Sequence, residues 1–399
     1  MDMQLSELRL RLHALTVFRA LREDPVIKGL IRYLDCRDNE NAAVEAYADF
    51  VSRLFEARTE SLSLYVQDRV NDDENVYMRA YGRGELPSAV LRQCVETELV
   101  TLQAVADLTP ETLLADRSCA AILPGFATTP TDLAEGYRHR TENIGRYGYG
   151  MYARYHMFYL DGDGHIVPVC HPDETRLSEL VDYEREQQIL LSNTRALLRG
   201  KPAANILLTG DAGTGKSSTV KAVVNELYTE GLRILEVRKE QLRELPAILD
   251  ELTQNPLKFI LFIDDLSFQK DDDNFSALKA ILEGSVSAKS QNVVIYATSN
   301  RRHLVKESFT DREGDDIHFN DTMQEIISLS ERFGIQITFN RPDKKTYLDI
   351  VHHLADAHGI DMASDKLEAA AERFALGRGT RSARAARQFV DSLIAAKED

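Results

Sequence analysis

The chain has 399 residues, of which 43% are hydrophobic and 28% charged, as is typical of a globular protein with two or three domains. Its 64 acidic and 48 basic residues give a formal net charge of −16, which argues against general nucleic-acid binding, although a local basic patch would escape this argument. No apolar run approaches the ~20 residues that a membrane span needs.

Neither the first residues nor the cysteines indicate an exported protein. Met1–Glu7 lacks the basic stretch and apolar core of a signal peptide. The four cysteines are scattered without the spacing of a metal site: Cys36, Cys94, Cys119 and Cys170. We therefore expect reduced thiols in a cytoplasmic protein.

Residues 1 to about 60 are expected to be helical. The first apolar residues at helical spacing are Leu5, Leu8, Leu12 and Leu15. A second set follows: Ala43, Tyr47, Phe50, Leu54 and Phe55. Stripes this short favour core packing over a coiled-coil partner face. Mixed helical segments continue to residue 120, around a polar break at residues 71–75.

Residues 136–170 change to an aromatic and glycine-rich sequence. Two β-rich runs, Tyr155–Leu160 and His165–Val169, flank a Gly/Asp turn and predict a hairpin. The aromatic segment from Tyr147 to Tyr159 favours packed aromatic strands over a surface that grips a peptide or stacks on bases. A calcium loop starting at Asp161 is excluded, because residues 166 and 172 are Ile and Pro rather than the required Gly and Glu.

A linker at His171–Glu174 and a helix over Leu177–Leu198 are expected next. Leu180, Val181 and Tyr183 lie in this stretch, just before the glycine-rich segment described below. Apolar surface at this place would bury a flat base, so these residues are candidates to contact an adenine. Ordinary core packing explains them equally well.

The stretch Gly210–Ser217 fits G-x-x-x-x-G-K-[ST], the pattern of a phosphate-binding loop. An apolar run suited to a buried strand precedes it, and a helix is expected over residues 218–228. Glycines bring backbone N–H groups close to phosphate oxygens, and the helix presents the positive end of its dipole. Lys216 would reach the β- and γ-phosphates of ATP, and the Ser217 hydroxyl would ligate Mg²⁺. The strand–loop–helix setting argues against a chance glycine-rich turn.

Strands and helices alternate between residues 205 and 340, which predicts an α/β fold with a five-stranded parallel sheet. The expected strands are residues 205–209, 233–237, 259–263, 292–297 and 335–339. Ligands of such sheets bind at the carboxyl ends of the strands. Asp264 follows the apolar third strand and is expected to hold Mg²⁺ through water. Asp265 could orient and deprotonate the attacking water, or it could only cap the strand end.

Residues 341–399 predict three helices, over residues 345–357, 365–376 and 381–396. A small helical domain after the sheet indicates a lid. With the phosphate loop, Asp264-Asp265, Ser299-Asn300 and Leu329–Gly334, this segment resembles the AAA+ ATPase module over roughly residues 173–399. The sequence is similar to that of an uncharacterised bacterial family of AAA+ ATP-binding proteins, a domain-of-unknown-function family. The segments that carry this similarity are Gly213–Ser218, Phe262–Phe268, Ala297–Leu304 and Arg381–Phe389.

The resemblance implies roles for further residues. Asn300 is similar to the sensor-1 residue, which helps to place the hydrolytic water. Arg332 is similar to the arginine finger, which completes a neighbouring subunit's site and implies a homo-oligomer. Arg381 or Arg384 is similar to sensor-2, which contacts the γ-phosphate from the lid. The nucleotide-contacting set is Gly210, Asp211, Ala212, Gly213, Thr214, Gly215, Lys216, Ser217 and Ser218.

Two departures from common AAA+ patterns bear on the activity. Asp265 stands where Glu is usual, so the carboxylate is one methylene shorter and hydrolysis is expected to be slow. Arg238–Leu242 lacks the aromatic-hydrophobic-glycine pore loop of protein unfoldases, which argues against peptide threading.

We therefore expect a mainly helical N-terminal domain with an aromatic-rich hairpin (1–172), an AAA+ core (173–340) and a helical lid (341–399). The expected function is ATP hydrolysis that drives a conformational change on a protein client. The alternative is an ATP-dependent binding switch or loader with little turnover. A small-molecule kinase fits less well, because Asn300 and Arg332 match residues that serve hydrolysis.

Overall fold

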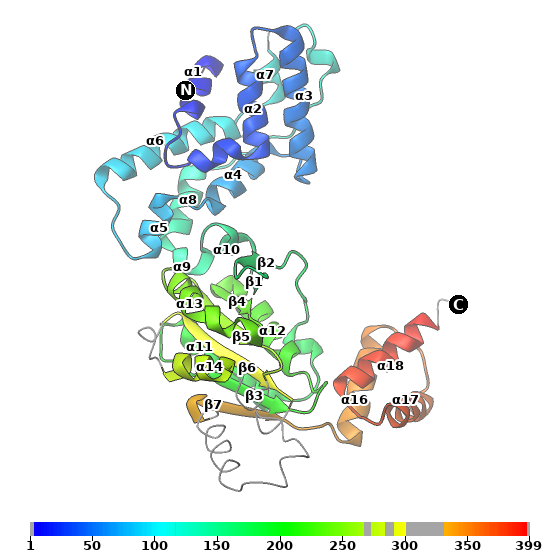
Figure 1. The fold of residues 1–399 in the computed structure, drawn as a ribbon. Coiled ribbons are helices and arrows are strands. Elements are labelled where there is room, and N and C mark those ends of the chain that lie inside the picture. The colour runs from blue at the N-terminus through cyan, green and yellow to red at the C-terminus, as the bar shows by residue number, and fades with distance from the viewer. Residues whose placement is uncertain (1–3, 116, 267–272, 284–290, 301–330, 397–399) are drawn as a thin grey trace. The chain divides into compact units, whose positions relative to one another are not determined.

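The computed structural model describes residues 4–115, 117–266, 273–283, 291–300 and 331–396 (Figure 1). The chain divides into two compact units, Met1–Arg154 and Tyr155–Asp399. Parts of three sequence segments on which the family resemblance rests lie outside the described residues, at 267–268, 301–304 and 329–330. In the described part of the chain, every helix is too short or too polar to cross a lipid bilayer.

The described residues of the first unit form helices joined by loops (Figure 1). The longer helices are α1 (Leu5–His13), α2 (Pro25–Asp35), α3 (Glu40–Glu56), α4 (Leu62–Asp72), α5 (Val76–Gly82), α6 (Ala89–Ala106) and α8 (Leu133–Glu142). The shorter ones are η1 (Arg19–Glu23), α7 (Pro110–Leu114), η2 (Ala120–Ile122), α9 (Ile144–Tyr147) and α10 (Met151–Arg154). Their apolar faces meet in one core that contains Leu8, Leu12, Tyr47 and Phe50. The two expected apolar stripes therefore pack inward, except that Phe55 is 46% exposed.

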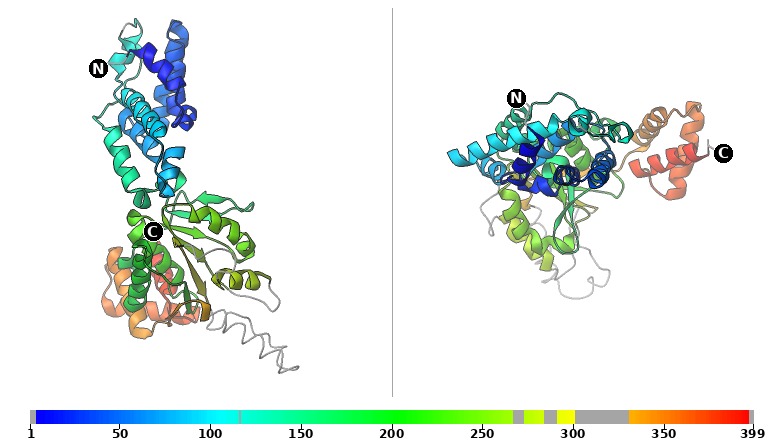
Figure 2. Two further views of the ribbon diagram at one scale, coloured as in Figure 1. Left: turned by 90° about the vertical axis from the view of Figure 1, so that its left-hand side faces the viewer. Right: turned by 90° about the horizontal axis from the view of Figure 1, so that it is seen from above.

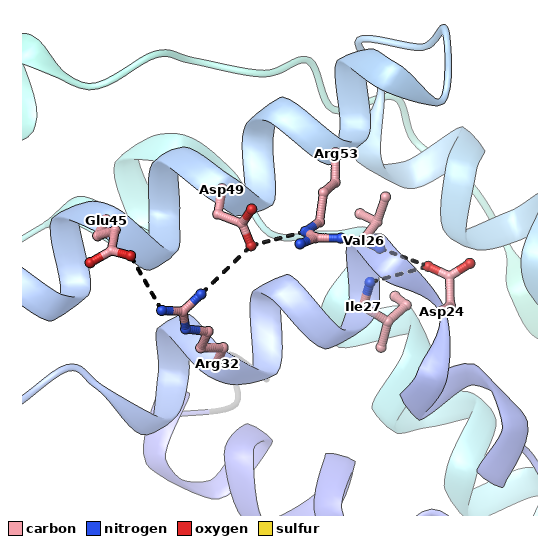
Figure 3. A network of polar contacts seen from close by, with 7 residues as sticks. All are labelled: Asp24, Val26, Ile27, Arg32, Glu45, Asp49 and Arg53. Atoms are coloured by element: carbon pink, nitrogen blue, oxygen red, sulfur yellow. Dashed lines mark hydrogen bonds and ion pairs between the residues drawn. The ribbon is translucent and has the colours of Figure 1, made fainter.

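Helices α2 and α3 lie side by side (Figure 3). Asp24 caps α2 by accepting hydrogen bonds from the backbone N–H groups of Val26 and Ile27, at 3.0 and 3.2 Å. A Cβ at Gly29 would lie 3.1 Å from the Cα of Phe50, so glycine lets the two helices approach closely. On the exposed side, Arg32 forms ion pairs with two carboxylates of α3, Glu45 and Asp49.

The second unit is built on a seven-stranded sheet in the order β2-β1-β4-β5-β6-β3-β7. The strands are β1 (Met157–Leu160), β2 (Ile166–Pro168), β3 (Ile206–Gly210), β4 (Leu232–Glu236), β5 (Lys258–Ile263), β6 (Val293–Ser299) and β7 (Ile335–Phe339). All neighbouring pairs are parallel except β1 and β2. The predicted α/β class, the parallel core and the C-terminal helices are confirmed, and the five expected strands are β3 to β7.

The expected hairpin forms, but it belongs to the sheet. β1 pairs with β4 in parallel, with Met157 opposite Ile234 and Tyr159 opposite Glu236. The hairpin thus satisfies backbone groups that would otherwise be unpaired at the β4 edge. The compact units divide between Arg154 and Tyr155, whereas the sequence predicted a boundary after residue 172. Two β-rich runs around a turn predict a hairpin, but they do not reveal that the hairpin pairs with a strand more than 70 residues later in the chain.

Two helices cover one face of the sheet, namely α11 (Glu184–Leu198) and α12 (Lys216–Leu227). Alternate sheet residues such as Ile206, Ile260 and Tyr296 point into the same core. The remaining elements between the strands are η3 (Leu177–Glu179), η4 (Tyr228–Glu230), η5 (Lys239–Glu244), α13 (Leu245–Thr253) and α14 (Asp273–Glu283).

The last helices are α16 (Lys344–Ala357), α17 (Ser364–Arg378) and α18 (Ala383–Ala395) (Figure 2). They share a separate core in which Tyr347, Val351, Ala371 and Ala386 are buried. Three helices with a core of their own match the expected lid. Val181, from the segment before α11, also packs against this core.

Candidate functional site

The phosphate loop joins β3 to α12, as the motif predicted. Gly210, Gly213 and Gly215 have φ values of 147°, 80° and 90°, which side chains rarely tolerate. A Cβ on Gly210 would lie 2.2 Å from the carbonyl oxygen of Phe339 in β7, so a larger residue does not fit there. Helix α12 begins at Lys216, and the unpaired N–H groups of its first turn are suited to anions.

Lys216 is nearly buried, with 5% exposure. Its Nζ donates hydrogen bonds to the backbone oxygens of Gly210 and Asp211, at 2.9 and 2.8 Å, and to Asn300 Oδ1 at 3.1 Å. Burial lowers the pKa of Lys216, while Asp264 and other nearby carboxylates act in the opposite direction. The ammonium group is thus held at the floor of the loop by neutral acceptors.

Ser217 and Asp264 meet at the candidate metal position. The Ser217 hydroxyl donates to Asp264 Oδ1 at 2.6 Å, and the Thr298 hydroxyl donates to the same oxygen at 2.5 Å. The backbone N–H of Asp265 donates to Thr298 Oγ1 at 2.9 Å. A hydroxyl and a carboxylate in contact offer the hard oxygen ligands that Mg²⁺ prefers, so the residues present fit this ion.

Asp265 and Asn300 form a second polar pair beside the loop. Asn300 Nδ2 donates to Asp265 Oδ1 at 2.7 Å, while Asn300 Oδ1 accepts from Lys216. The backbone of Asp265 has a φ of 53°, in the left-handed region that costs a non-glycine residue energy. The side chain of Asp265 is thus held by Asn300 at the end of β5, and its role in positioning the attacking water stays a prediction.

An apolar wall faces this polar floor. Leu180, Val181 and Tyr183 line the same cleft of about 540 Å³ as the phosphate loop. Ile350 and Leu354 of α16 also line it. The three adenine candidates therefore lie where a base joined to loop-bound phosphates could reach them.

The helix expected from Leu177 is interrupted, which corrects the prediction. A short turn at Leu177–Glu179 is followed by Asp182 and Tyr183 with φ values of 74° and 69°, and α11 starts at Glu184. The buried Gln187 holds this turn, because its Nε2 donates to the carbonyl oxygens of Leu180 and Asp182, both at 3.2 Å. The interruption releases the segment from the helix and turns it towards the cleft.

Tyr183 fixes the wall to the strand that leads into the lid. Its ring lies against Phe339, with centroids 4.8 Å apart. Its hydroxyl donates to the carbonyl oxygen of Asn340, directly after β7. Burial raises the pKa of Tyr183, so the hydroxyl stays a donor at neutral pH.

The two sensor-2 candidates occupy different places. Arg384 lines the cleft, and its backbone N–H donates to the carbonyl oxygen of Gly213 at 3.4 Å. Arg381 instead makes two hydrogen bonds to Glu372, at 3.0 and 2.9 Å, and does not line the cleft. The geometry therefore favours Arg384 as the arginine that reaches a nucleotide.

Arg332 lies three residues before the start of β7 at Ile335, and it is not among the residues that line the cleft. A residue that serves a neighbouring subunit would lie outside its own site in this way. The remaining residues of the predicted set, Asp211, Ala212, Thr214 and Ser218, belong to the loop and the first turn of α12. All of these except Asp211 line the cleft.

Sequence reasoning missed several polar residues of the cleft. They are Glu179, Thr219, Thr298, Arg387, Gln388 and Asp391. Thr298 directly precedes Ser299-Asn300 at the end of a strand, which was the available signal. Arg387, Gln388 and Asp391 recur with Arg384 at spacings of three or four residues, so they share one face of α18.

A family described as protein of unknown function (DUF815) matches residues 153–397, well over half of the chain. Together with the phosphate loop, parallel sheet and C-terminal helices, this match confirms the recognition of an AAA+ module in an uncharacterised family. The comparison with curated proteins gives no match.

Solved structures of low identity resemble parts of the chain. The Thermotoga maritima RuvB Holliday junction branch migration motor is 16% identical, with 55% of this chain and 72% of that chain covered and a TM-score of 0.35. For C. elegans PCH-2 the identity is 18%, the coverage 47% and 52%, and the TM-score 0.34. For a chain of the E. coli MS115-1 HORMA:CdnC:Trip13 complex these values are 14%, 55% and 92%, and 0.36.

Proposed function

We propose that this protein, which belongs to the DUF815 family of unknown function, binds ATP with Mg²⁺ and hydrolyses it. One observation carries the proposal. Lys216 is hydrogen-bonded to the Asp265–Asn300 pair, and Thr298 connects that pair to the Ser217–Asp264 pair, all at the carboxyl ends of β3, β5 and β6. Parallel α/β sheets bind their ligands at this edge.

Binding would use the loop and Lys216 together. The backbone N–H groups of the loop and of the first turn of α12 would bond phosphate oxygens. Lys216 now donates to backbone carbonyls and an amide. A phosphate would offer this cation charged acceptors, which form stronger hydrogen bonds than neutral ones.

Ser217 and Asp264 would hold Mg²⁺, which when bound supplies charge neutralisation at the phosphates. Thr298 orients Asp264 from the buried side through the 2.5 Å hydrogen bond. Asp265 would accept a proton from the attacking water, and Asn300 would hold that water in line. Asp265 is the shorter acid, so turnover is expected to be slow.

We further propose a cytoplasmic homo-oligomer in which Arg332 of one subunit completes the site of its neighbour. The position of Arg332 beside β7, outside the lining of its own cleft, supports this arrangement. Movement of α16–α18 with the nucleotide state would act on a protein client. The link from Tyr183 to Asn340 supports such coupling, because it joins the apolar wall to the strand end before α16.

An ATP-dependent binding switch with little turnover is the second candidate. It is favoured by Asp265, because Asp stands where Glu is usual and the carboxylate is one methylene shorter. Phosphate release in the steady state separates the two, because a switch would release phosphate at no more than a trace rate while still binding ATP.

Thermal unfolding with ATP and Mg²⁺ tests the site. A ligand at 100 times its Kd stabilises by about 2.7 kcal/mol, which corresponds to a rise in Tm of roughly 5–10 °C for a unit of this size. Lys216→Ala should abolish this rise. Lys221→Ala is the matched control, because Lys221 lies on the same helix, pairs with Glu236 at 3.1 Å and does not line the cleft. Equal rises in wild type and Lys216→Ala would refute the site.

A further inference from the structure

The first unit contains a groove that the nucleotide site does not involve. It lies between α6 and α8, with α5 at one end, and has a volume of about 760 Å³. Along α6 its lining runs from Arg92 through Glu96 and Val100 to Gln103 and Asp107, at the spacing of one helix face. The fifteen rises of 1.5 Å between Arg92 and Asp107 make this wall roughly 22 Å long, about four helical turns.

The floor of the groove is aromatic and apolar. Val95, Leu99 and Tyr137 are buried beneath it, with 3%, 6% and 2% exposure. The half-buried rings of Tyr77 and Tyr81 lie 5.1 Å apart at the α5 end. Val100 is 58% exposed although it stands among these residues. Tyrosines with adjacent exposed aliphatic surface are typical of protein-binding surfaces.

The rim of the groove is acidic. Five exposed carboxylates line it: Glu96, Asp107, Asp132, Glu135 and Glu142. Only two guanidinium groups, those of Arg92 and Arg138, oppose them among the lining residues. The rim therefore carries an excess of three negative charges, which would attract a cationic partner.

We propose that this groove docks a basic amphipathic helix of a partner protein. Three features select this occupant. The walls are helices, so the groove offers no strand edge to which an extended peptide could add. Its length suits about four turns of helix, with apolar residues at i, i+3 or i+4 and i+7 against the tyrosines. Lysines and arginines on both flanks of that helix would face the acidic rim.

The inference does not depend on ATP binding, because every lining residue belongs to the first compact unit. Docking is therefore measured on the full chain without nucleotide. A failure of docking would leave the Lys216 experiment untouched, and the reverse also holds.

A displayed library of random 16-residue peptides, selected on the full chain, is the probe. The enriched sequences should combine helical apolar spacing with net positive charge. Their affinity is then measured by fluorescence anisotropy. Val100→Asp places a charge on the floor and should weaken binding at least tenfold. Val90→Asp is the matched control, since Val90 is 72% exposed on the same helix but outside the groove.

Charge reversal tests the rim separately. The double variant Glu96→Lys, Glu142→Lys should lower the affinity for the basic peptides at least tenfold and reduce the salt dependence of their binding. Glu56→Lys, at the exposed end of α3, should leave binding unchanged. Circular dichroism melts show whether each variant is folded, and these exposed positions are expected to tolerate the changes.

Three outcomes would overturn the proposal. The selection could yield no peptide, or peptides without positive charge and helical spacing. The enriched peptides could bind Val100→Asp as well as wild type. Sedimentation could show self-association that Val100→Asp abolishes and Val90→Asp does not, in which case a second copy of the chain occupies the groove.

Discussion

The choice between Arg381 and Arg384 gives the sharpest test of the cleft. Arg384→Ala removes a guanidinium group beside the phosphate loop, where the backbone of Arg384 already contacts Gly213. Arg384 also contributes to lowering the pKa of Lys216, so the two cations share one local field. An anion at the loop would therefore interact with both.

A hydrogen bond to a charged group contributes about 1.5–3 kcal/mol. Loss of one such bond from Arg384 should raise the Kd for a non-hydrolysable ATP analogue about 10- to 150-fold. If the contact is to the γ-phosphate, the Kd for ADP should change much less. Isothermal titration calorimetry with both nucleotides measures this difference directly.

Arg381→Ala is the matched control, three residues away in the sequence. Its guanidinium is already engaged by Glu372 at 2.9 and 3.0 Å, so its removal should cost a little stability and leave nucleotide affinity unchanged. The reasoning is refuted if Arg381→Ala raises the Kd for the ATP analogue as much as Arg384→Ala does. Equal losses for the ATP analogue and ADP would instead exclude a γ-phosphate contact.

Two further predictions concern assembly and pH. Arg332→Ala should nearly silence ATP hydrolysis, since an arginine finger contributes ~10³–10⁵ in rate, and mixing it with Lys216→Ala should restore part of the activity; a co-assembled mixture that stays inactive contradicts a shared site. In the first unit, burial raises the pKa of Asp73 to about 6, above its unfolded value, so its stabilising contribution is present at low pH and lost as the pH rises through 6. The urea midpoint of Asp73→Asn should therefore exceed that of wild type above pH 6, and the difference should disappear below about pH 4; a constant difference would contradict this.

The strands of the nucleotide-binding core could be predicted because each is a short, buried, apolar run. Phe259–Ile263 was expected and Lys258–Ile263 is observed, and Ile335–Phe339 has the predicted bounds. The phosphate loop could be predicted from the fixed order of its glycines. Asp264 and Asp265 could be predicted because they directly follow an apolar strand, and ligands of parallel sheets bind at the carboxyl ends of the strands.

The remaining features depend on contacts between distant residues. Periodicity extended a helix through Asp182 and Tyr183, whereas a buried Gln187 and the ring of Phe339 stabilise a left-handed turn there. Arg381 and Arg384 look alike in the sequence, and they are separated by the ion pair of Arg381 with Glu372 and by the place of Arg384 in the cleft lining. The groove of the first unit was not predicted either, because its walls come from helices that are separated in the chain.

The chain of hydrogen bonds from Lys216 to Asp265 suggests how phosphate binding prepares the water site. Asn300 joins the two, accepting from Lys216 at 3.1 Å and donating to Asp265 at 2.7 Å. Asp265 is anchored through its backbone by Thr298, whereas the Asn300 amide is held through its side-chain bonds to Lys216 and Asp265. We propose that a phosphate bound to Lys216 would draw the ammonium group away from the Asn300 oxygen, which could then accept a hydrogen bond from a water.

Asp265 and Asn300 should then act as a unit in hydrolysis. Asp265→Asn and Asn300→Ala should each lower kcat by a factor of about 10² or more, as loss of a general base does, while the Kd for ATP changes little. The double variant should be no slower than the slower single variant, because neither group works without the other. Thr298→Val should weaken both Asp264 and Asp265 positioning, lowering kcat and the affinity for Mg²⁺ together. Additive losses in the double variant would show that Asn300 places the water without Asp265, and the hydrogen bond between them would then be structural.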